Sequence, residues 1–467
     1  MEPAFAGAVL LRNELLLFAG VGLLIGGIDD LLLDLIYGIR RLWRSLAVYS
    51  RFPRMTAPDL PPAGAAGPIA VFIPAWDEAG VIGDMLRGCL AAWREDDVQL
   101  FVGAYPNDAA TIDAICRAMA DMADQGETRL TLVVNHRPGP TTKADCLNQL
   151  WAAMRRWEAA TGREMLAVVL HDAEDVVHPD AMRLIGLLAP RFALVQLPVL
   201  PLVSRGSRWV SGHYCDEFAE AHGKALLTRE ALGAAMPSAG VGCGINRTAL
   251  GRIAAEREDR PFDPASLTED YELGLRLGEA GGRGILARMR DARGGLIATR
   301  EYFPDTLSAA VRQKARWTVG IALAGWDRLG WSRSWSEIWM RLRDRRAALA
   351  ALILLAAYAG LLLGVALPVA EMLAGRGPSA LPAGLQGLMV VNALLLLWRL
   401  LVRMLFVWRA YGPVEAVRSV PRTLVANIIA MMAARRAVAI YVRHLRGQAL
   451  SWDKTAHRYP VADPVPA

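Results

Sequence analysis

The sequence predicts an α/β domain with a mostly parallel, Rossmann-like sheet, fused to helices that cross or lie on a membrane. Two observations predict this fold class. Between residues 65 and 300, short apolar segments alternate with amphipathic segments, as in the β-α-β units of a parallel sheet. Two uncharged apolar runs, Ala347–Ala370 and Gly377–Trp398, each exceed the roughly 20 residues that a spanning helix needs. With 54% hydrophobic and 21% charged residues, a disordered or collagen-like chain is excluded.

Net charge and cysteine content indicate which partners and which cysteine chemistry to expect. The 467 residues carry a formal net charge of +6. A basic surplus can indicate a nucleic-acid partner, but here arginines cluster beside the apolar segments, as membrane-flanking residues do. We therefore expect no nucleic-acid partner. The cysteines are odd in number and no pair has metal-ligand spacing, so we expect reduced thiols at Cys89, Cys116, Cys146, Cys215 and Cys243.

The first predicted unit, residues 1–64, is a transmembrane helix followed by a basic linker. Leu15–Ile28 is apolar but short, and the pattern continues past three aspartates, so we place the helix within residues 5–37. The start lacks a basic region and no small-residue cleavage site follows. We therefore expect a retained helix and not a cleaved signal peptide.

Residues 65–300 form the second predicted unit, the α/β domain. Neither of the two common phosphate-binding glycine loops, GxGxxG and GxxxxGK[ST], occurs in it. In such sheets, ligands bind at the carboxyl ends of the strands. The predicted strands are Ile69–Ile73, Gln99–Ala104, Leu130–Val134, Ala167–Leu170 and Ala193–Leu197, and the predicted helices are Val81–Trp93, Ala109–Met122, Lys143–Glu158 and Asp180–Leu188.

The next two units approach and cross the membrane. Residues 301–346 are expected to form interface helices, and residues 347–410 two transmembrane helices, the second near Leu385–Val407. Arginines precede and follow these spans, whereas the loop between them holds only Arg376. The positive-inside rule then places the N-terminus outside and residues 40–346 in the cytoplasm.

Residues 411–467 form the last predicted unit, an interfacial helix and a cytoplasmic tail. Leu424–Ala434 is apolar but is followed by Arg435 and Arg436, which a fourth span would have to bury or displace. We therefore favour an amphipathic helix on the cytoplasmic membrane surface. A fourth span within residues 411–445 stays the alternative.

Carboxylates cluster after the strand that is predicted to end at Leu170. The segment HDAED places Asp172, Glu174 and Asp175 at the sheet edge where ligands bind. Their hard oxygen atoms suit Mg²⁺ or Mn²⁺ holding a diphosphate. The alternative interpretation is that Asp172 or Asp175 caps a helix near Pro179.

Two further segments carry charge at helix starts. Glu269 and Asp270 begin an amphipathic helix, where the alternative is a capping box formed with Thr268. Lys143 opens the helix after the third strand, from which it could reach a phosphate or simply face solvent.

A third segment lies on a predicted helix before the second span. Gln313, Arg316 and Trp317 follow the spacing i, i+3, i+4 and therefore share one helix face. The alternative is a membrane-surface helix with an anchoring tryptophan. Each segment alone is a weak signal, but their order and spacing together are much stronger.

In this order the motifs resemble those of membrane-bound family 2 glycosyltransferases, the group that contains cellulose, chitin and hyaluronan synthases. The match covers about residues 65–460. PAWDEAG is similar to the opening P-x-x-N-E element, with Asp77 where Asn is usual, HDAED to the D-x-D metal motif, TED to the general-base motif and QKARW to the Q-x-x-R-W signature. YPND, TKADCLN, the glycine loop GVGCGIN and the tail W-x-K-T-x-H at Trp452–His457 complete the set.

The resemblance implies a cytoplasmic GT-A domain and inverting transfer from a UDP-sugar. It implies Asp270 as general base, with Glu269 and Arg316 as catalytic neighbours. A departing diphosphate would be stabilised by Mg²⁺ or Mn²⁺. The resemblance implies nucleotide-sugar binding by Pro74, Asp77, Glu78, Asp108, Lys143, Asn148 and Gln313, acceptor contacts by Trp317, Gly240 and Gly242, and metal binding by Asp172 with Glu174 or Asp175.

Within the family, the chain looks most like the NfrB-like, phage-adsorption-protein-B branch of the bacterial inner membrane. N-acetylhexosamine donors are then favoured over UDP-glucose, with a growing polysaccharide or a lipid-linked sugar as acceptor. Members of this branch can carry a cyclic-di-GMP-sensing domain. Because the chain stops at Ala467, we expect export or nucleotide control to involve a partner protein. The alternative function is an inactive glycosyltransferase-like scaffold in polysaccharide secretion or phage adsorption.

Overall fold

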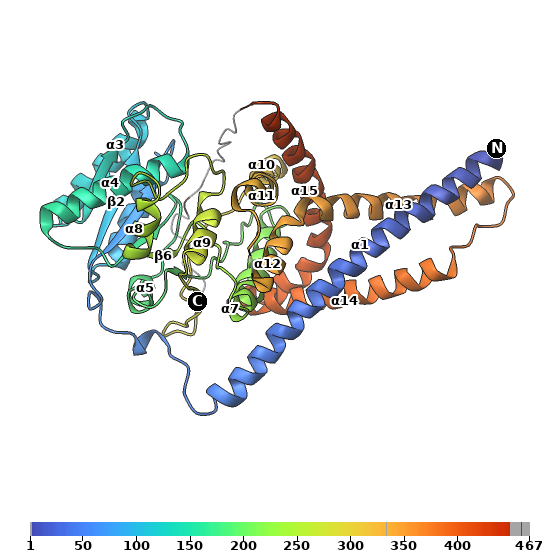
Figure 1. Cartoon of the computed structure of the whole chain (residues 1–467), viewed down its shortest axis with the longest axis horizontal. Coiled ribbons are helices and arrows are strands. Elements are labelled where there is room, and N and C mark those ends of the chain that lie inside the picture. Colours follow the sequence, from blue (N-terminus) through green and yellow to red (C-terminus); the bar gives the residue numbers. More distant parts are fainter. Residues whose placement is uncertain (1, 333, 449–458, 460–467) are drawn as a thin grey trace.

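A seven-stranded sheet forms the core of the domain on the left of Figure 1. The computed structural model describes residues 2–332, 334–448 and 459. The strand order is β3-β2-β1-β4-β6-β5-β7, and every neighbouring pair is parallel except those of β6, which runs antiparallel to β4 and β5. The strands are β1 (Ile69–Pro74), β2 (Val98–Ala104), β3 (Leu130–Val134), β4 (Ala167–Leu170), β5 (Leu194–Gln196), β6 (Cys243–Asn246) and β7 (Gly284–Leu286).

The five predicted strands are confirmed, whereas β6 and β7 were missed. β6 has four residues and lies in the segment that the sequence analysis treated as a glycine loop. β7 has three residues. Length alone does not explain this, since β4 and β5 are equally short. β6 and β7 instead lie in the glycine-rich stretches GVGCGIN and GGRGIL, which lack the continuous apolar run that indicates a buried strand.

Helices cover both faces of the sheet, because alternate strand residues point to opposite sides. In β1, Val71 and Ile73 belong to one buried cluster with α2, α3 and α5, whereas Ala70 and Phe72 belong to the other with α4, α8 and α9. These helices are α2 (Ile82–Ala92), α3 (Ala109–Ala123), α4 (Lys143–Thr161), α5 (Ala181–Leu188), α8 (Arg247–Ala255) and α9 (Glu269–Glu279).

Shorter helices join this domain to the membrane part. α12 ends at Arg345, two residues before the first residue of α13. The connecting elements are α6 (Gly212–Glu220), the π-helical turn η3 (Ala221–Ala225), α7 (Leu226–Ala231), α10 (Leu307–Trp317), the π-helical turn η4 (Thr318–Leu323), α11 (Ala324–Leu329) and α12 (Trp335–Arg345).

Among the described residues, four helices are long and apolar enough to cross a membrane: α1 (Glu2–Trp43), α13 (Ala347–Leu373), α14 (Ala383–Tyr411) and α15 (Pro413–Leu445). α1 contacts both α13 and α14. Two glycines allow this approach, since a Cβ on Gly22 would lie 2.6 Å from Ile353 and one on Gly27 would lie 2.8 Å from Leu395. Small residues at helix contacts are typical of membrane bundles.

Ion pairs mark the level at which α1, α13 and α14 meet the α/β domain. Arg346 contacts Asp29 at 2.6 Å and Asp30 at 2.8 Å, and Arg343 contacts Asp30 at 2.8 Å. Arg399 of α14 lies 3.6 Å from Asp30. Charges gathered at one level suit the membrane–water interface, whereas the cytoplasmic side of these helices stays a prediction.

α15 runs across the direction of α1, α13 and α14, between them and the α/β domain (Figure 1). It contacts α10 and α6 as well as α13 and α14. Arg435 and Arg436 are exposed, whereas Ala433 and Ala437 pack against α10 and η4 residues. This orientation favours the membrane-surface helix over a fourth span, although the assignment stays a prediction. The predicted tail Trp452–His457 lies outside the described residues.

Candidate active site

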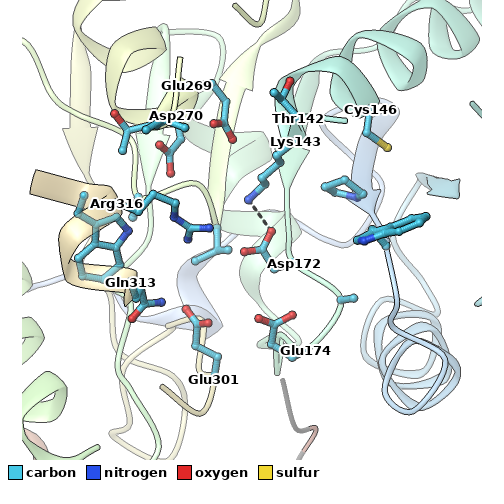
Figure 2. Close-up of a pocket in the computed structure, with 18 of the residues that line it drawn as sticks. Thr142, Lys143, Cys146, Asp172, Glu174, Glu269, Asp270, Glu301, Gln313 and Arg316 are labelled. Atoms are coloured by element: carbon cyan, nitrogen blue, oxygen red, sulfur yellow. Dashed lines mark ion pairs between the residues drawn. The ribbon is translucent and has the colours of Figure 1, made fainter. Parts of the chain in front are cut away.

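One cavity opens at the carboxyl edge of the sheet, where the ends of β1, β2 and β4 meet α4, α9 and α10. Figure 2 shows carboxylates and basic groups converging in it from two sides. Its charged and polar wall is formed by Glu78, Thr142, Lys143, Asp172, Glu174, Thr268, Glu269, Asp270, Glu301, Gln313 and Arg316.

The HDAED segment divides between the cavity and the core. Asp172 and Glu174 line the cavity. Asp175 does not, because its Oδ2 atom contacts His171 Nδ1 at 2.6 Å and accepts the Asp172 backbone N–H at 3.2 Å in the interior. The capping alternative is not observed, since the residue that precedes α5 is Asp180, which makes no side-chain cap.

Lys143 is a cavity residue and not a surface lysine. Its ammonium lies 2.5 Å from Asp172 Oδ1. Burial lowers the pKa of Lys143, but the carboxylates of Asp172, Glu269 and Asp270 outweigh that effect and hold the pKa above its usual value. The side chain therefore stays charged and faces the cavity.

The donor set of the cavity fits a hard divalent ion in part. Asp172 and Glu174 offer carboxylate oxygens on one wall, which Mg²⁺ and Mn²⁺ prefer. Within residues 2–332, 334–448 and 459, no group of three or more His, Cys, Asp or Glu is arranged to hold a metal ion. Two carboxylates would therefore need oxygens of a bound diphosphate to complete the coordination.

Glu269 and Asp270 begin α9 and line the opposite wall. Asp270 Oδ1 accepts the backbone N–H of Tyr271 at 2.7 Å. Burial raises the pKa of Asp270, against the lowering effect of Lys143. Burial and then the neighbouring Asp270 raise the pKa of Glu269 to about 7. The capping box is not observed, because Thr268 makes no side-chain cap to α9.

The QKARW segment presents its predicted face to the cavity. Gln313, Arg316 and Trp317 on α10 all line it, and Figure 2 shows Arg316 pointing toward Asp172. Trp317 stands beside Phe303, with ring centroids 6.4 Å apart, and beside Phe218 at the same distance. This end of the cavity therefore combines an aromatic wall with a charged guanidinium.

The other end of the cavity is formed by the segment after β1. Pro74 and Glu78 line it, but Asp77 does not. Asp77 has a φ of +55° and donates its backbone N–H to Asp108 Oδ2 at 2.6 Å. Asp108 also caps α3 by accepting the Thr111 N–H at 3.2 Å. In this structure Asp108 therefore shapes the turn that carries Glu78.

Two other predicted residues lie away from the cavity. Asn148 is buried and forms a pair of hydrogen bonds with the backbone of Phe262, at 2.7 and 3.1 Å. Gly242 has a φ of +56°, and a Cβ there would overlap Thr299. Gly240, by contrast, lies directly against the Asp270 carboxylate.

Among the cavity residues that the sequence analysis did not predict, five are aromatic or acidic. Trp76 and Tyr105 form an edge-to-face pair at the β1 end, with ring centroids 5.1 Å apart. Phe218, Glu301 and Phe303 line the α10 end. Trp76 and Tyr105 stand beside motifs that the analysis used, so the position just after a strand was an available signal. Glu301 and the two phenylalanines come from loops and a short helix without a motif.

Comparisons with known proteins agree with this geometry. Residues 66–320 match the family described as Glycosyltransferase like family 2. The chain is 36% identical over 463 residues to bacteriophage adsorption protein B of Escherichia coli (strain K12), and equally to bacteriophage N4 adsorption protein B of Escherichia coli O157:H7. Each alignment covers 93% of this chain and 60% of the relative, so the chain spans about three fifths of their length.

A solved structure shows the same fold. The mannosyltransferase PcManGT from Pyrobaculum calidifontis, in complex with GDP-Man and Mn²⁺, matches with a TM-score of 0.52 and 17% identity, over 91% of this chain and 99% of that chain. The family match over more than half of the chain and the 36% identity to the two adsorption proteins show that the chain belongs to the family 2-like glycosyltransferases, with a GT-A-like domain joined to long apolar helices.

Proposed function

We propose that the chain is a membrane-bound, metal-dependent glycosyltransferase that transfers a sugar with inversion from a UDP-sugar, N-acetylhexosamine being favoured. One observation carries the proposal. Glu269 and Asp270 face Lys143 and the Asp172–Glu174 wall across a single cavity, and Arg316 points toward Asp172 (Figure 2). An inverting transfer needs this separation, because the acceptor and the leaving diphosphate occupy opposite sides of the anomeric carbon.

The reaction balances in one displacement. The acceptor hydroxyl oxygen forms a bond to the anomeric carbon while the bond from that carbon to the diphosphate oxygen breaks. The hydroxyl proton passes to the Asp270 carboxylate. The electron pair of the broken bond stays on the diphosphate, where Lys143 and Arg316 offer positive charge.

Asp172 and Glu174 would hold the divalent ion. When bound, Mg²⁺ or Mn²⁺ supplies charge neutralisation for the diphosphate. The solved mannosyltransferase is in complex with GDP-Man and Mn²⁺. The cavity carries several carboxylates against Lys143 and Arg316 among its described residues, so an anionic donor needs such an ion.

Trp317, with Gly240 nearby, would form the acceptor side. The CH face of a sugar packs on an aromatic ring, and Trp317 stands among aromatic residues at the α10 end of the cavity. α10 contacts α15, which places this end toward the membrane helices. A lipid-linked sugar or a growing polysaccharide are the acceptors that this location supports.

We further propose that the domain lies in the cytoplasm of a bacterium, on its inner membrane. Arginines of α12 and α14 gather where α1, α13 and α14 meet the α/β domain. Export of a polymer would involve a partner protein, and so would control by cyclic di-GMP. The adsorption proteins B are longer than this chain, so their whole activity is not transferred to it.

The test is nucleotide release by the purified protein in nanodiscs. A panel of UDP-sugars and GDP-sugars would be tested with Mg²⁺ and Mn²⁺, for wild type, Asp270→Asn and Asp121→Asn, an exposed control on α3. Metal-dependent turnover with one donor, lost only in Asp270→Asn, is expected. Absence of both turnover and nucleotide binding in the wild type would contradict the proposal and favour a scaffold.

A further inference from the structure

The helix that carries the proposed base is held at its first turn by a contact outside the cavity. Tyr271 follows Asp270 in the chain and donates its backbone N–H to the Asp270 carboxylate at 2.7 Å. Its hydroxyl donates to Oδ2 of Asp344 on α12 at 2.6 Å. One residue therefore connects the proposed base to a helix that leads into the membrane.

The Asp344 carboxylate also contacts a second buried donor, Arg229. Arg229 of α7 contacts Asp344 Oδ2 at 2.7 Å and the carbonyl of Ala235 at 2.6 Å. Tyr271 is 7% exposed and Arg229 is 3% exposed, so both donors to Asp344 are buried, whereas the Asp344 side chain is 21% exposed. Burial and the Asp344 carboxylate raise the pKa of Tyr271 well above its usual value, which keeps its hydroxyl protonated and donating.

Asp344 lies in the last turn of α12, where the helix dipole disfavours a negative charge. An acid at this position therefore does not stabilise α12 itself. Two buried donors offset the unfavourable position, so the carboxylate serves a tertiary contact.

The neighbours of Asp344 in the chain reach the membrane helices. Arg343 lies 2.8 Å from Asp30 of α1, and Arg346 lies 2.6 Å from Asp29. α13 begins at the residue after Arg346. The start of α9 is therefore bonded to the short segment that also joins α12 to α1.

We propose that Tyr271 and Asp344 are positioning residues that fix the Asp270 carboxylate relative to the membrane-anchored helix α12. The inference rests on the proposed role of Asp270 as general base. Neither residue lines the cavity, so neither contacts donor or acceptor. Loss of their contact would let the first turn of α9 shift, and small displacements of a reacting group lower the rate of the chemical step.

Tyr271→Phe removes the hydroxyl and leaves the ring and the backbone N–H. We expect kcat to fall about tenfold, with the donor KM and the Kd for UDP unchanged, because only the base is displaced. Asp344→Asn is expected to lower kcat as well. The double variant should be no slower than the slower single variant, since both substitutions break the same contact between Tyr271 and Asp344.

Tyr411→Phe is the matched control. The Tyr411 hydroxyl on α14 donates to the carbonyl of Pro201 at 2.9 Å, also between a membrane helix and the α/β domain, but away from α9. Its loss should lower the melting temperature comparably and leave kcat unchanged. An equal fall of kcat in Tyr411→Phe, or an unchanged kcat in Tyr271→Phe, would overturn the positioning role.

Amide hydrogen exchange gives a readout that needs no activity. Peptides covering residues 268–275 should exchange about fivefold faster in Tyr271→Phe than in wild type, and at the wild-type rate in Tyr411→Phe. Unchanged exchange in Tyr271→Phe would overturn the inference. If wild type transfers no sugar, the proposed function fails, whereas the exchange comparison still decides whether Tyr271 holds the start of α9.

Discussion

The Asp270 carboxylate occupies the space that a side chain at Gly240 would fill. Gly240 has a φ of +77°, and a Cβ there would overlap Asp270 Oδ2. Gly240→Ala should therefore displace the proposed base and lower kcat at least about 100-fold, while UDP binding is retained. Steady-state kinetics and calorimetric UDP titration measure the two effects.

Gly126→Ala is the control for backbone strain. Gly126 has a φ of +79° and no atom within 4 Å of an added Cβ. This substitution should cost about 1 kcal/mol of stability from the left-handed backbone and leave kcat unchanged. Full activity of Gly240→Ala would show that catalysis does not depend on the observed position of the Asp270 carboxylate.

The two acids at the end of HDAED should differ in their response to metal. Glu174 lines the cavity, whereas Asp175 contacts His171 in the interior. Glu174→Gln should raise the Mn²⁺ concentration for half-maximal activity at least about tenfold, because it removes a ligand. Asp175→Asn should leave that concentration unchanged. Titrating both variants with Mn²⁺ decides whether Glu174 or Asp175 binds the metal. A reversed result would assign the metal to Asp175.

The acidic limb of the pH–activity profile should report ionisation of the Glu269–Asp270 pair, so activity should rise with pH there. Burial raises the pKa of both carboxyls, that of Glu269 to about 7, and the two titrate together. Asp270 cannot accept a proton while it is protonated, and burial raises its pKa, so kcat/KM should increase with pH and then level off. Glu269→Gln removes a neighbouring negative charge and should move the limb to lower pH. A limb that stays in place would exclude coupling between the two acids.

The same pKa shift predicts a stability effect. The folded state binds the Glu269 proton more tightly than the unfolded chain, where the pKa is near 4.5. The stability of the metal-free protein that comes from this group is therefore present below pH 4.5 and is lost as the pH rises to about 7. Glu269→Gln should weaken that dependence, as measured by thermal unfolding across the range.

Cysteine labelling tests the orientation of α15. In a chain whose exposed Cys116 is replaced by Ala, single cysteines at Val414, Gln448 and Gly377 would be labelled from outside intact cells with a membrane-impermeant reagent. A membrane-surface helix keeps Val414→Cys and Gln448→Cys on one side, so only Gly377→Cys should react. Labelling of Gln448→Cys would establish a fourth span.

Periodicity was sufficient for the long elements of the fold. The alternation from Ile69 to Leu170 predicted four consecutive strands with their helices, because each strand is a short apolar run and each helix has an apolar face. It failed for β6 and β7, whose three or four residues pair with strands distant in sequence. Antiparallel pairing of β6 with β4 is decided by tertiary packing.

Motif order likewise predicted which segments meet, but not which atoms face the cavity. Lys143, Asp172, Asp270 and Arg316 line one space as expected. Asn148 instead bonds to the backbone of Phe262, because its helix turns that side chain toward a loop over 100 residues away in the chain.

Local spacing and composition were enough to predict the order of the elements, the chemical groups at the sheet edge and the lengths of the apolar helices. They could not predict that Glu174 faces the cavity while Asp175 does not, or that Tyr271 reaches Asp344. Such contacts join residues far apart in the chain, so they depend on packing angles between helices that no local pattern encodes.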